Sequence, residues 1–333
     1  MAIRNRLLYS APPAHDMTPT LSIILPVYNG AAYLPAALDS LTRQTALDQL
    51  EIIVLDDGST DGSLDLVRAY APRLPLTVAP NIRSGNWVTN TNRGLALARG
   101  RYVCFLHQDD LWLEGRMAWI LDALRRHPDC PVLFSAANYL DPHHQTAGRW
   151  TAPFAGNREQ VLAPMDWFCP LLVQNYIAIP APVFRRDLIT SAQPLDESLP
   201  YAADWKWWLT LARRHPACYR PQPTVGFRVH PESQTVNLTS DPEAYRLQLQ
   251  GVYAAFAPGA PDTPQGRRWQ AAAELGLVAN ATMAALFHRQ RPPWGRFFQA
   301  LGRAGMRGGL LYVKASRLRE RLAARLRILL RPR

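Results

Sequence analysis

Apolar and polar stretches alternate along the first 140 residues in a way that predicts strands and helices in turn. Short, mostly apolar runs of the buried-strand type occupy residues 21–27, 51–55, 76–79, 101–106 and 131–136. The stretches between these runs have helical spacing, as at Leu34, Leu38 and Leu41. Because parallel strands need crossover connections, which helices usually provide, this order predicts a parallel sheet with helices on its faces.

Polar residues gather where three of these predicted strands end. Tyr28-Asn29-Gly30 follows the first strand, Asp56 to Ser59 follows the second, and His107 to Asp110 follows the fourth. Ligands of parallel sheets collect at the carboxyl ends of the strands, so a nucleotide site is expected at this edge. Neither of the usual glycine-rich phosphate-binding patterns is present, GxGxxG after the first strand or GxxxxGK[ST] anywhere. We therefore expect a metal ion on carboxylates to hold the phosphates.

The composition changes twice farther along the chain. From about residue 138 to 230 it is rich in Trp, Pro and Tyr, and such rings either stack on sugars or fill a core. Beyond about residue 239, Ala, Leu, Arg and Gln dominate, which indicates a helical region. The expected organisation is an N-terminal tail (1–19), an α/β domain (20–238) and a helical C-terminal region (239–333).

The bulk properties narrow the class of protein. The chain has 333 residues and 48% hydrophobic content, which is ordinary for a globular protein. Of its formal net charge of +11, residues 303–333 carry +9, so the rest is nearly neutral and we expect no nucleic-acid partner. The four cysteines are far apart and are expected to be reduced core thiols of a cytoplasmic protein. We expect neither a signal peptide nor a membrane span, since no unbroken apolar run approaches about 18 residues.

The basic C-terminal segment predicts an amphipathic helix. Its arginines at 317, 321 and 325 fall on another side from its leucines, which are Leu318, Leu322, Leu326 and Leu329. A cationic amphipathic helix favours docking on an anionic membrane surface through residues 303–333, with the protein peripheral on the inner face of the cytoplasmic membrane. The alternative is a helix that packs its leucines on the catalytic domain and leaves its arginines in water.

Four ordered motifs over residues 20 to 235 resemble the family 2 glycosyltransferases. SIILPVYNGAAYLPAALDSLTRQT is similar to the opening strand, loop and helix of the family, and IIVLDDGSTDGS to its diphosphonucleoside-binding turn. FLHQDDLWLEGRM occupies the place of the DXD motif, and LDESLPYAADWKWWLTLAR resembles the segment with the catalytic base. The resemblance implies an inverting enzyme with the GT-A fold, a Rossmann-like, mostly parallel sheet with flanking helices, plus the helical C-terminal region.

The resemblance assigns the nucleotide to the first two motifs. It implies that Pro26 and Tyr28 contact the nucleotide, with Tyr28 against the base, and that Asp57 accepts the imide N–H of a uracil or thymine, as in a UDP or dTDP donor. The segment from Asp56 to Ser59 also has good turn chemistry for capping the next helix, and both roles can hold together.

The third motif is implied to bind a divalent metal. Asp109 matches the last aspartate of the DXD motif, which ligates Mg²⁺ or Mn²⁺ on the donor diphosphate. The first acid is replaced by His107, which either binds the metal, and then favours Mn²⁺, or only makes hydrogen bonds at the strand end. Asp110 is expected to orient sugar hydroxyls or to cap the following helix.

The fourth motif supplies the implied general base, Asp204. The reaction is a single displacement, so one carboxylate takes the proton from the acceptor hydroxyl. The preceding glutamate of the family is replaced by Ala203, and the alternative role of Asp204 is to cap its helix. Further on, FRVHPESQT resembles the closing R-x-H segment, which places Arg228 or His230 near the diphosphate or the metal.

The expected function is transfer of a hexosyl or deoxyhexosyl unit to a glycan or lipid-linked glycan in surface polysaccharide or lipopolysaccharide synthesis. The wording QDDLW is similar to that of deoxysugar transferases such as rhamnosyltransferases. A nucleotidyltransferase would need a glycine-rich basic loop where PVYNGAAYLP stands, and a processive synthase would need QxxRW and membrane helices. The alternative of another class is a catalytically idle module that binds nucleotide sugars or glycans, and His107 and Ala203 motivate it.

Overall fold

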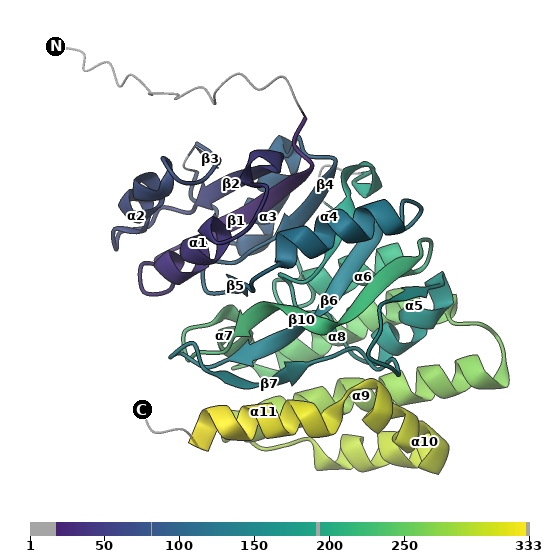
Figure 1. The fold of residues 1–333 in the computed structure, drawn as a ribbon. Helices are drawn as coiled ribbons and strands as arrows, with labels where there is room; N and C mark the ends of the chain where they lie inside the picture. The colour runs from purple at the N-terminus through teal and green to yellow at the C-terminus, as the bar shows by residue number, and fades with distance from the viewer. Residues whose placement is uncertain (1–17, 81, 191–193, 331–333) are drawn as a thin grey trace.

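A large mixed sheet forms the centre of the molecule in the computed structural model, which describes residues 18–80, 82–190 and 194–330 (Figure 1). The strands are β1 (Leu21–Val27), β2 (Leu50–Asp56), β3 (Leu76–Val78), β4 (Tyr102–Phe105), β5 (Leu111–Trp112), β6 (Val132–Leu140), β7 (Thr146–Trp150), β8 (Gln160–Leu162), β9 (Val183–Arg185) and β10 (Ala217–Arg228). All five predicted strands are present with similar bounds.

The sheet has the order β3-β2-β1-β4-β9-β6-β10-β5, with β7 beside β6 and β8 beside β10. The first half is parallel, as predicted, and β6 is parallel to β10. The short strand β9 was not predicted. It lies antiparallel between β4 and β6, and it joins the two parallel halves into one surface.

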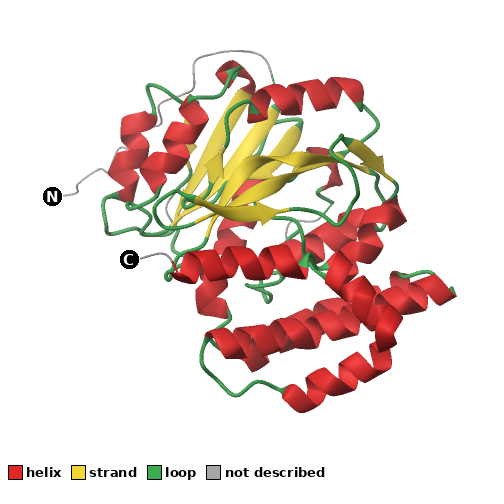
Figure 2. Ribbon diagram, turned by 60° about the horizontal axis from the view of Figure 1, so that its bottom comes forward, coloured by secondary structure: helices red, strands yellow, loops and turns green. Residues whose placement is uncertain are grey.

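The helices cover both faces of the sheet (Figure 2). They are α1 (Leu34–Thr42), α2 (Ser63–Tyr70), α3 (Trp87–Leu97), α4 (Arg116–Arg126), α5 (Pro164–Val173), α6 (Ala203–Ala212), α7 (Gln234–Leu238), α8 (Pro242–Phe256), α9 (Pro264–Phe287), α10 (Trp294–Ala315) and α11 (Leu318–Leu330). Alternate residues of β1 point to opposite faces, so Ile23 packs in one core with α1, α2 and α4, and Ile24 packs in another with α3, α5 and α6. The predicted helical positions Leu34, Leu38 and Leu41 are all fully buried.

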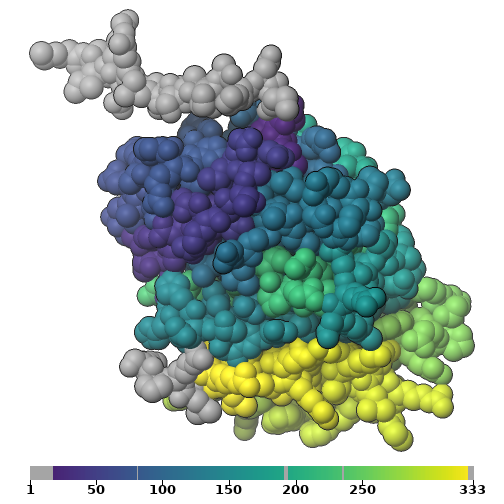
Figure 3. All heavy atoms as spheres, in the orientation of Figure 1, coloured from purple at the N-terminus to yellow at the C-terminus, as the bar shows by residue number. Residues whose placement is uncertain are grey.

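The C-terminal helices extend the second of these cores. Residues of α8, α9 and α10 belong to the same apolar cluster as α5 and α6. The chain then returns along β7, where α11 lies close enough for Ala324 to pack against Gly148 and Ala147. Figure 3 shows the resulting layer, in yellow, against the teal part of the chain.

Two simpler expectations concern the cysteines and the membrane. The four cysteines are buried and unpaired, as predicted for core thiols. Within the described ranges, none of the helices combines the length and the apolar content that a membrane crossing requires. Most of the predicted N-terminal tail lies outside the described residues.

The predicted amphipathic helix is present as α11, but two of its leucines do not face the protein. Leu322 and Leu326 are exposed, with 41% and 56% of their surface open to solvent. Arg321 and Arg325 are partly buried and face the interior of the molecule. Leu318, by contrast, packs against the second core, and Arg319 and Arg327 are exposed. The helix therefore packs on the protein, as the alternative expected, but with Leu322 and Leu326 outward and with Arg321 and Arg325 turned inward.

Candidate functional site

The ends of β1 and β4 are joined by a single side chain, Gln108. Its Oε1 atom accepts a hydrogen bond of 2.8 Å from the backbone N–H of Tyr28, and its Nε2 atom donates one of 3.0 Å to the Tyr28 carbonyl. The carboxamide lies so close to Gly30 that a Cβ atom there would overlap it. The first and third motifs thus meet at one edge of the sheet.

The three residues expected to contact the nucleotide differ in exposure. Pro26 is buried inside β1, whereas the ring of Tyr28 is 45% exposed, with the guanidinium of Arg83 above it. Asp57 is buried and accepts hydrogen bonds from the backbone N–H groups of Ser84 and Gly85. Burial alone would raise the pKa of Asp57, but these bonds outweigh it and the net pKa is lowered. The carboxylate is therefore ionised and holds the loop at 84–85 beside Tyr28.

The Asp56 turn orders its own loop as the sequence predicted. The Oδ2 atom of Asp56 accepts hydrogen bonds from the N–H groups of Gly58 and Ser59, each of 3.2 Å. The turn does not cap the next helix as expected, because α2 begins only after Gly62. The carboxylate near its first turn is that of Asp61, whose Oδ1 atom accepts a hydrogen bond from the Ser63 N–H. Ser59 instead accepts a hydrogen bond from the Asn29 backbone, which ties the turn to the end of β1.

Asp109 and His230 are brought together from distant parts of the chain. The Oδ2 atom of Asp109 lies 3.0 Å from the Nε2 atom of His230. Burial alone would raise the pKa of Asp109, but the hydrogen bond from His230 and the nearby imidazole of His107 more than offset it, and the net pKa is lowered. An ionised carboxylate with two imidazoles beside it is a suitable starting point for a metal site.

The residues His107, Asp109 and Asp110 can together hold a divalent cation. One ligand atom from each lies within 4.8 Å of the others. The buried Nε2 atom of His107 and the buried Oδ2 atom of Asp110 have no hydrogen-bond partner in the described part of the chain. Buried polar atoms without partners are costly, and a bound cation would satisfy both. The oxygen and imidazole donors fit Mn²⁺ or Mg²⁺.

Asp110 is more deeply placed than expected. It is 1% exposed, and its Oδ1 atom accepts a hydrogen bond of 3.0 Å from the backbone N–H of Arg228. Burial and the neighbouring charge of Asp109 raise its pKa well above the ordinary value. It does not cap the next helix, because α4 begins at Arg116 after Gly115.

Arg228 is buried and already occupied by protein partners. Its guanidinium donates to the carbonyl oxygens of Asp109 and Asp141 at 2.8 and 3.0 Å, and it contacts the Nδ1 atom of His144 at 2.8 Å. It also lies over the ring of Tyr33, 5.0 Å from the ring centre. In this arrangement the side chain supports the turn that carries Asp109, and a contact of Arg228 with the diphosphate stays a prediction.

Asp204 lies in the first turn of α6, where its two carboxylate oxygens have different partners. The Oδ1 atom accepts from the Trp205 N–H at 2.6 Å, and the Oδ2 atom accepts from the Asn175 Nδ2 atom at 3.0 Å. The N-cap position of α6 is Ala202, so Asp204 is not the cap residue itself. Burial raises its pKa to about 6, and the two hydrogen bonds oppose that shift. A carboxylate with this pKa can accept a proton near neutral pH.

A cavity of about 570 Å³ lies between the turn at residues 107–110 and this carboxylate, since His107, His230 and Asp204 all line it. Aromatic rings of the Trp- and Tyr-rich region form much of its wall: Tyr139, Trp150, Tyr201 and Phe227. Other rings of that region, such as Trp167 and Trp208, are core residues with no exposed surface. Some of these rings therefore fill the core and others line the cavity, and stacking of the second group on a sugar stays a prediction.

Two positions that shape the site were not identified from the sequence. Asn175 bonds to Asp204, and Trp87 donates from Nε1 to the Pro200 carbonyl at 2.8 Å and packs its ring against His107. The amides Gln174 and Asn175 interrupt an otherwise apolar stretch, which was the available signal. Trp87 offered none, because its partners lie far along the chain.

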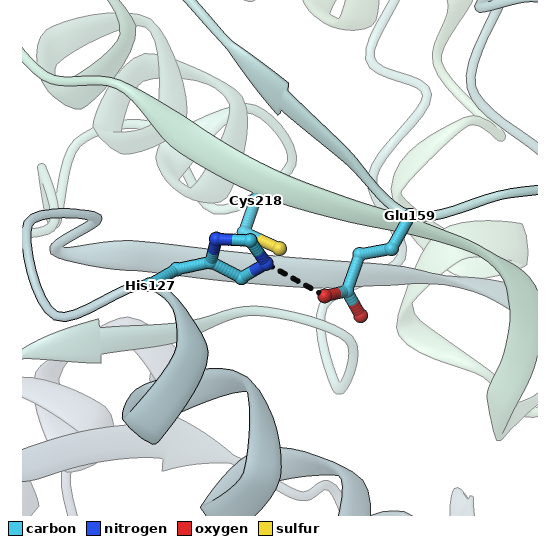
Figure 4. Close-up of side chains that lie close together, drawn as sticks. All are labelled: His127, Glu159 and Cys218. Atoms are coloured by element: carbon cyan, nitrogen blue, oxygen red, sulfur yellow. Dashed lines mark hydrogen bonds and ion pairs between the residues drawn. The ribbon is translucent and has the colours of Figure 1, made fainter.

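A second group of potential ligands, His127, Glu159 and Cys218, lies near the start of β10, whereas Arg228 marks its other end (Figure 4). Glu159 forms an ion pair with Arg126 at 2.6 Å and accepts a hydrogen bond from Trp119 at 2.7 Å. Burial raises the pKa of the Cys218 thiol, so it remains protonated. These contacts account for the group as a structural cluster.

Comparison with known proteins relates this chain to a family. Residues 22–169 match the model of glycosyl transferase family 2. A PGL/p-HBAD biosynthesis glycosyltransferase of Mycobacterium bovis is 31% identical over 189 residues, which are 56% of this chain and 67% of that protein. An uncharacterised glycosyltransferase of Rickettsia typhi is 26% identical over 66% of this chain and 67% of its own length.

Solved structures share the fold. Staphylococcus aureus TarS in complex with UDP-GlcNAc superposes with a TM-score of 0.62 and 17% identity, covering 93% of this chain and 90% of the other. A mannosyltransferase of Pyrobaculum calidifontis in complex with GDP-Man and Mn²⁺ gives a TM-score of 0.53 and 19% identity, covering 94% and 88%. With the GT-A-like sheet, the helical C-terminal region and the ordered motifs, these matches show that the chain belongs to glycosyl transferase family 2 and is a glycosyltransferase.

Proposed function

We propose that this enzyme transfers a hexosyl or deoxyhexosyl unit, with inversion, from a nucleoside diphosphate donor to a glycan or lipid-linked glycan in cell-surface polysaccharide synthesis. The observation that carries the proposal is the shared cavity, which Asp204 lines together with His107 and His230. The proposed proton acceptor and the proposed metal site thus face the same cavity, as a displacement at the anomeric carbon requires.

In the proposed reaction the acceptor oxygen attacks the anomeric carbon from the side of Asp204. The bond from that carbon to the diphosphate oxygen breaks, and its electron pair leaves with the nucleoside diphosphate. The hydroxyl proton passes to a carboxylate oxygen of Asp204, whose pKa of about 6 keeps it ionised at neutral pH. Asn175 holds that carboxylate by its Oδ2 atom. No covalent intermediate on the protein is needed.

For the donor we propose a UDP or dTDP sugar. Tyr28 offers an exposed ring for the base, and Asp57, whose backbone N–H donates to the carbonyl of Val27, the residue before Tyr28, has an ionised carboxylate. The solved relatives carry UDP-GlcNAc and GDP-Man in their own sites. A metal ion on Asp109, His107 and Asp110 would supply charge stabilisation for the departing diphosphate. Arg228 would act as a positioning residue that fixes Asp109 from below.

For location we propose a cytoplasmic enzyme that docks on an anionic membrane surface mainly through α10. This helix exposes two apolar stripes, one on each side of a kink at Gly305, which has φ 60°. Their members are Trp294, Phe298, Leu301, Met306, Leu310 and Val313. Arg296, Arg303 and Arg307 lie on the same helix, and Leu322 and Leu326 of α11 are also exposed. Apolar and cationic side chains together suit the boundary of an anionic bilayer.

The test is a screen of nucleotide sugars with Mn²⁺ for thermal stabilisation and for slow hydrolysis. A matching donor raises the melting temperature by mass action and is hydrolysed by the wild type. Hydrolysis that disappears in Asp204→Asn and Asp109→Ala supports the transferase. Tight binding without turnover on any donor and acceptor would favour the idle binding module instead.

A further inference from the structure

The wall of the cavity is formed partly by the C-terminal helix α11. Arg321 and Arg325 line the same cavity as Asp204, one helical turn apart on one face of α11. Both side chains are partly buried. The helix therefore presents two cations to a space in which a substrate is expected.

Neutral amides hold the first of these cations in place. The two terminal nitrogens of Arg321 donate to the Oε1 atom of Gln174 at 2.8 Å and to the Oδ1 atom of Asn280 at 2.9 Å. Amide oxygens orient a guanidinium without cancelling its charge. Its side chain is therefore fixed in direction.

Neither arginine of the pair forms an ion pair with a carboxylate of the described residues, although Asp141 and Asp204 line the same cavity. Among the described residues, no carboxylate lies within 4.0 Å of the guanidinium of Arg321 or of Arg325. Arg317 of the preceding turn differs, because it forms an ion pair with Glu320. Like charges at i and i+4 destabilise a helix slightly, and here the same helix leaves Leu322 and Leu326 in solvent. A helix that turns its arginines inward and its leucines to solvent loses folding stability. We therefore attribute this orientation to ligand binding.

A chain of hydrogen bonds runs from Arg321 to the proposed base. Gln174, which accepts from Arg321, donates from Nε2 to the Asn175 carbonyl at 3.2 Å. The Asn175 side chain in turn donates to Asp204. The cations thus lie on the acceptor side of the cavity, close to where the nucleophilic hydroxyl would sit.

We propose that the acceptor carries an oxyanion, a phosphate or a carboxylate, and that Arg321 and Arg325 bind it. The inference rests on the proposed transferase function and specifies its acceptor. Guanidinium groups match the planar, multiple acceptor geometry of these anions. The rings of Tyr139 and Trp150, which stack 5.2 Å apart, lie in the same cavity and can contact the sugar part.

Calorimetric titration with three soluble probes that share one sugar tests the proposal. They are octyl glucoside, which is neutral, octyl glucuronide, which has a carboxylate, and glucose joined to an octyl chain through a phosphodiester. We expect the wild type to bind at least one anionic probe about tenfold or more tightly than the neutral probe. Which one it prefers distinguishes an acidic glycan from a lipid-linked phosphate acceptor.

The variants are Arg325→Gln, Arg325→Lys and Arg321→Gln, with Arg268→Gln as control. Arg268 is an exposed residue of α9 outside the cavity. The anionic preference should disappear in Arg325→Gln, return in part in Arg325→Lys, and be unchanged in the control. Melting curves verify folding, and Arg325→Gln should be no less stable than the wild type since it removes a like-charge pair.

Equal affinity of the wild type for all three probes, or a preference that survives in folded Arg325→Gln and Arg321→Gln, would overturn the inference. The titrations involve no donor and no turnover. Their failure therefore leaves the transferase proposal intact, whereas failure to hydrolyse any nucleotide sugar counts against the transferase proposal itself.

Discussion

The carboxamide of Asn175 donates a hydrogen bond of 3.0 Å from its Nδ2 atom to the Oδ2 atom of Asp204. The bond favours the ionised carboxylate, while burial opposes ionisation and brings the pKa to about 6. The balance between these two effects leads to the first two predictions.

Asp204→Asn should lose about 10²- to 10⁴-fold in transfer rate, the range for removal of a general base. It should not lower the melting temperature at pH 8, because the ionised, buried carboxylate is unfavourable and the amide carries no charge. The pKa of Asp204 is about 6 in the folded state against 3.8 ordinarily. The stability that the variant gains over the wild type should therefore be absent below pH 3.8 and grow as the pH rises through 6. Asp187→Asn, at an exposed position, serves as the control for both rate and melting temperature.

The pH profile of kcat/KM should have an acid limb that is governed by Asp204. Activity should rise about tenfold per pH unit below pH 6 and level off above it, because only the ionised carboxylate accepts the proton. Asn175→Ala removes a bond to the ionised form, so the limb should move to higher pH. A limb at the same pH in this variant would show that the hydrogen bond does not tune the base.

The histidine in the third motif should weaken metal activation. Asp109→Ala should reduce Mn²⁺-dependent turnover by about 100-fold or more, equivalent to several kcal/mol. His107→Asp adds a charged oxygen ligand and should lower the Mn²⁺ concentration needed for half-maximal activity and improve Mg²⁺ as a substitute. Metal titrations of donor hydrolysis measure both effects. Unchanged metal dependence in His107→Asp would place His107 outside the metal shell.

Arg228 should matter for stability as well as for activity. Its buried guanidinium supports Asp109 and Asp141 by hydrogen bonds to their carbonyl oxygens, so Arg228→Met should cost about 3 kcal/mol or more. Arg68→Met, at an exposed surface ion pair, should cost less than about 1 kcal/mol. Urea denaturation compares the two. Equal stability of the two variants would contradict the positioning role of Arg228.

Membrane docking should depend on the apolar residues of α10. Wild-type protein should float with vesicles that contain phosphatidylglycerol, and the triple variant Phe298→Ser, Met306→Ser, Leu310→Ser should remain at the bottom of the gradient. The control is Leu97→Ser, a similarly exposed leucine on α3. Flotation of the triple variant at the level of the wild type would argue that α10 does not bind the bilayer.

The strand pattern was predictable because buried parallel strands are apolar along their whole length. The residues after β1, β2 and β4 could also be assigned to one edge, since parallel strands end on the same side. Strand β9 was missed because three residues after Pro182 are too few to give a pattern, and only pairing with β4 and β6 makes them a strand.

The orientation of α11 could not be predicted either. An amphipathic pattern shows that a helix has two faces, but its neighbours decide which face is turned inward. The partners of Arg321 are Gln174 and Asn280, which are distant in sequence. The partners of Arg228 could not be predicted for the same reason, because backbone carbonyl groups carry no signature in the side-chain sequence.

The two ends of the cavity come from separate parts of the chain, and this separation has an evolutionary consequence. His107 lies inside the segment 22–169 that matches the family model, whereas Arg321 and Arg325 lie well beyond it. With the acceptor site proposed for Arg321 and Arg325, mutations in α11 would change which acceptor is recognised without altering the segment that matches the family model. A lineage of such enzymes can diversify its products by varying its C-terminal helices while its nucleotide chemistry stays the same.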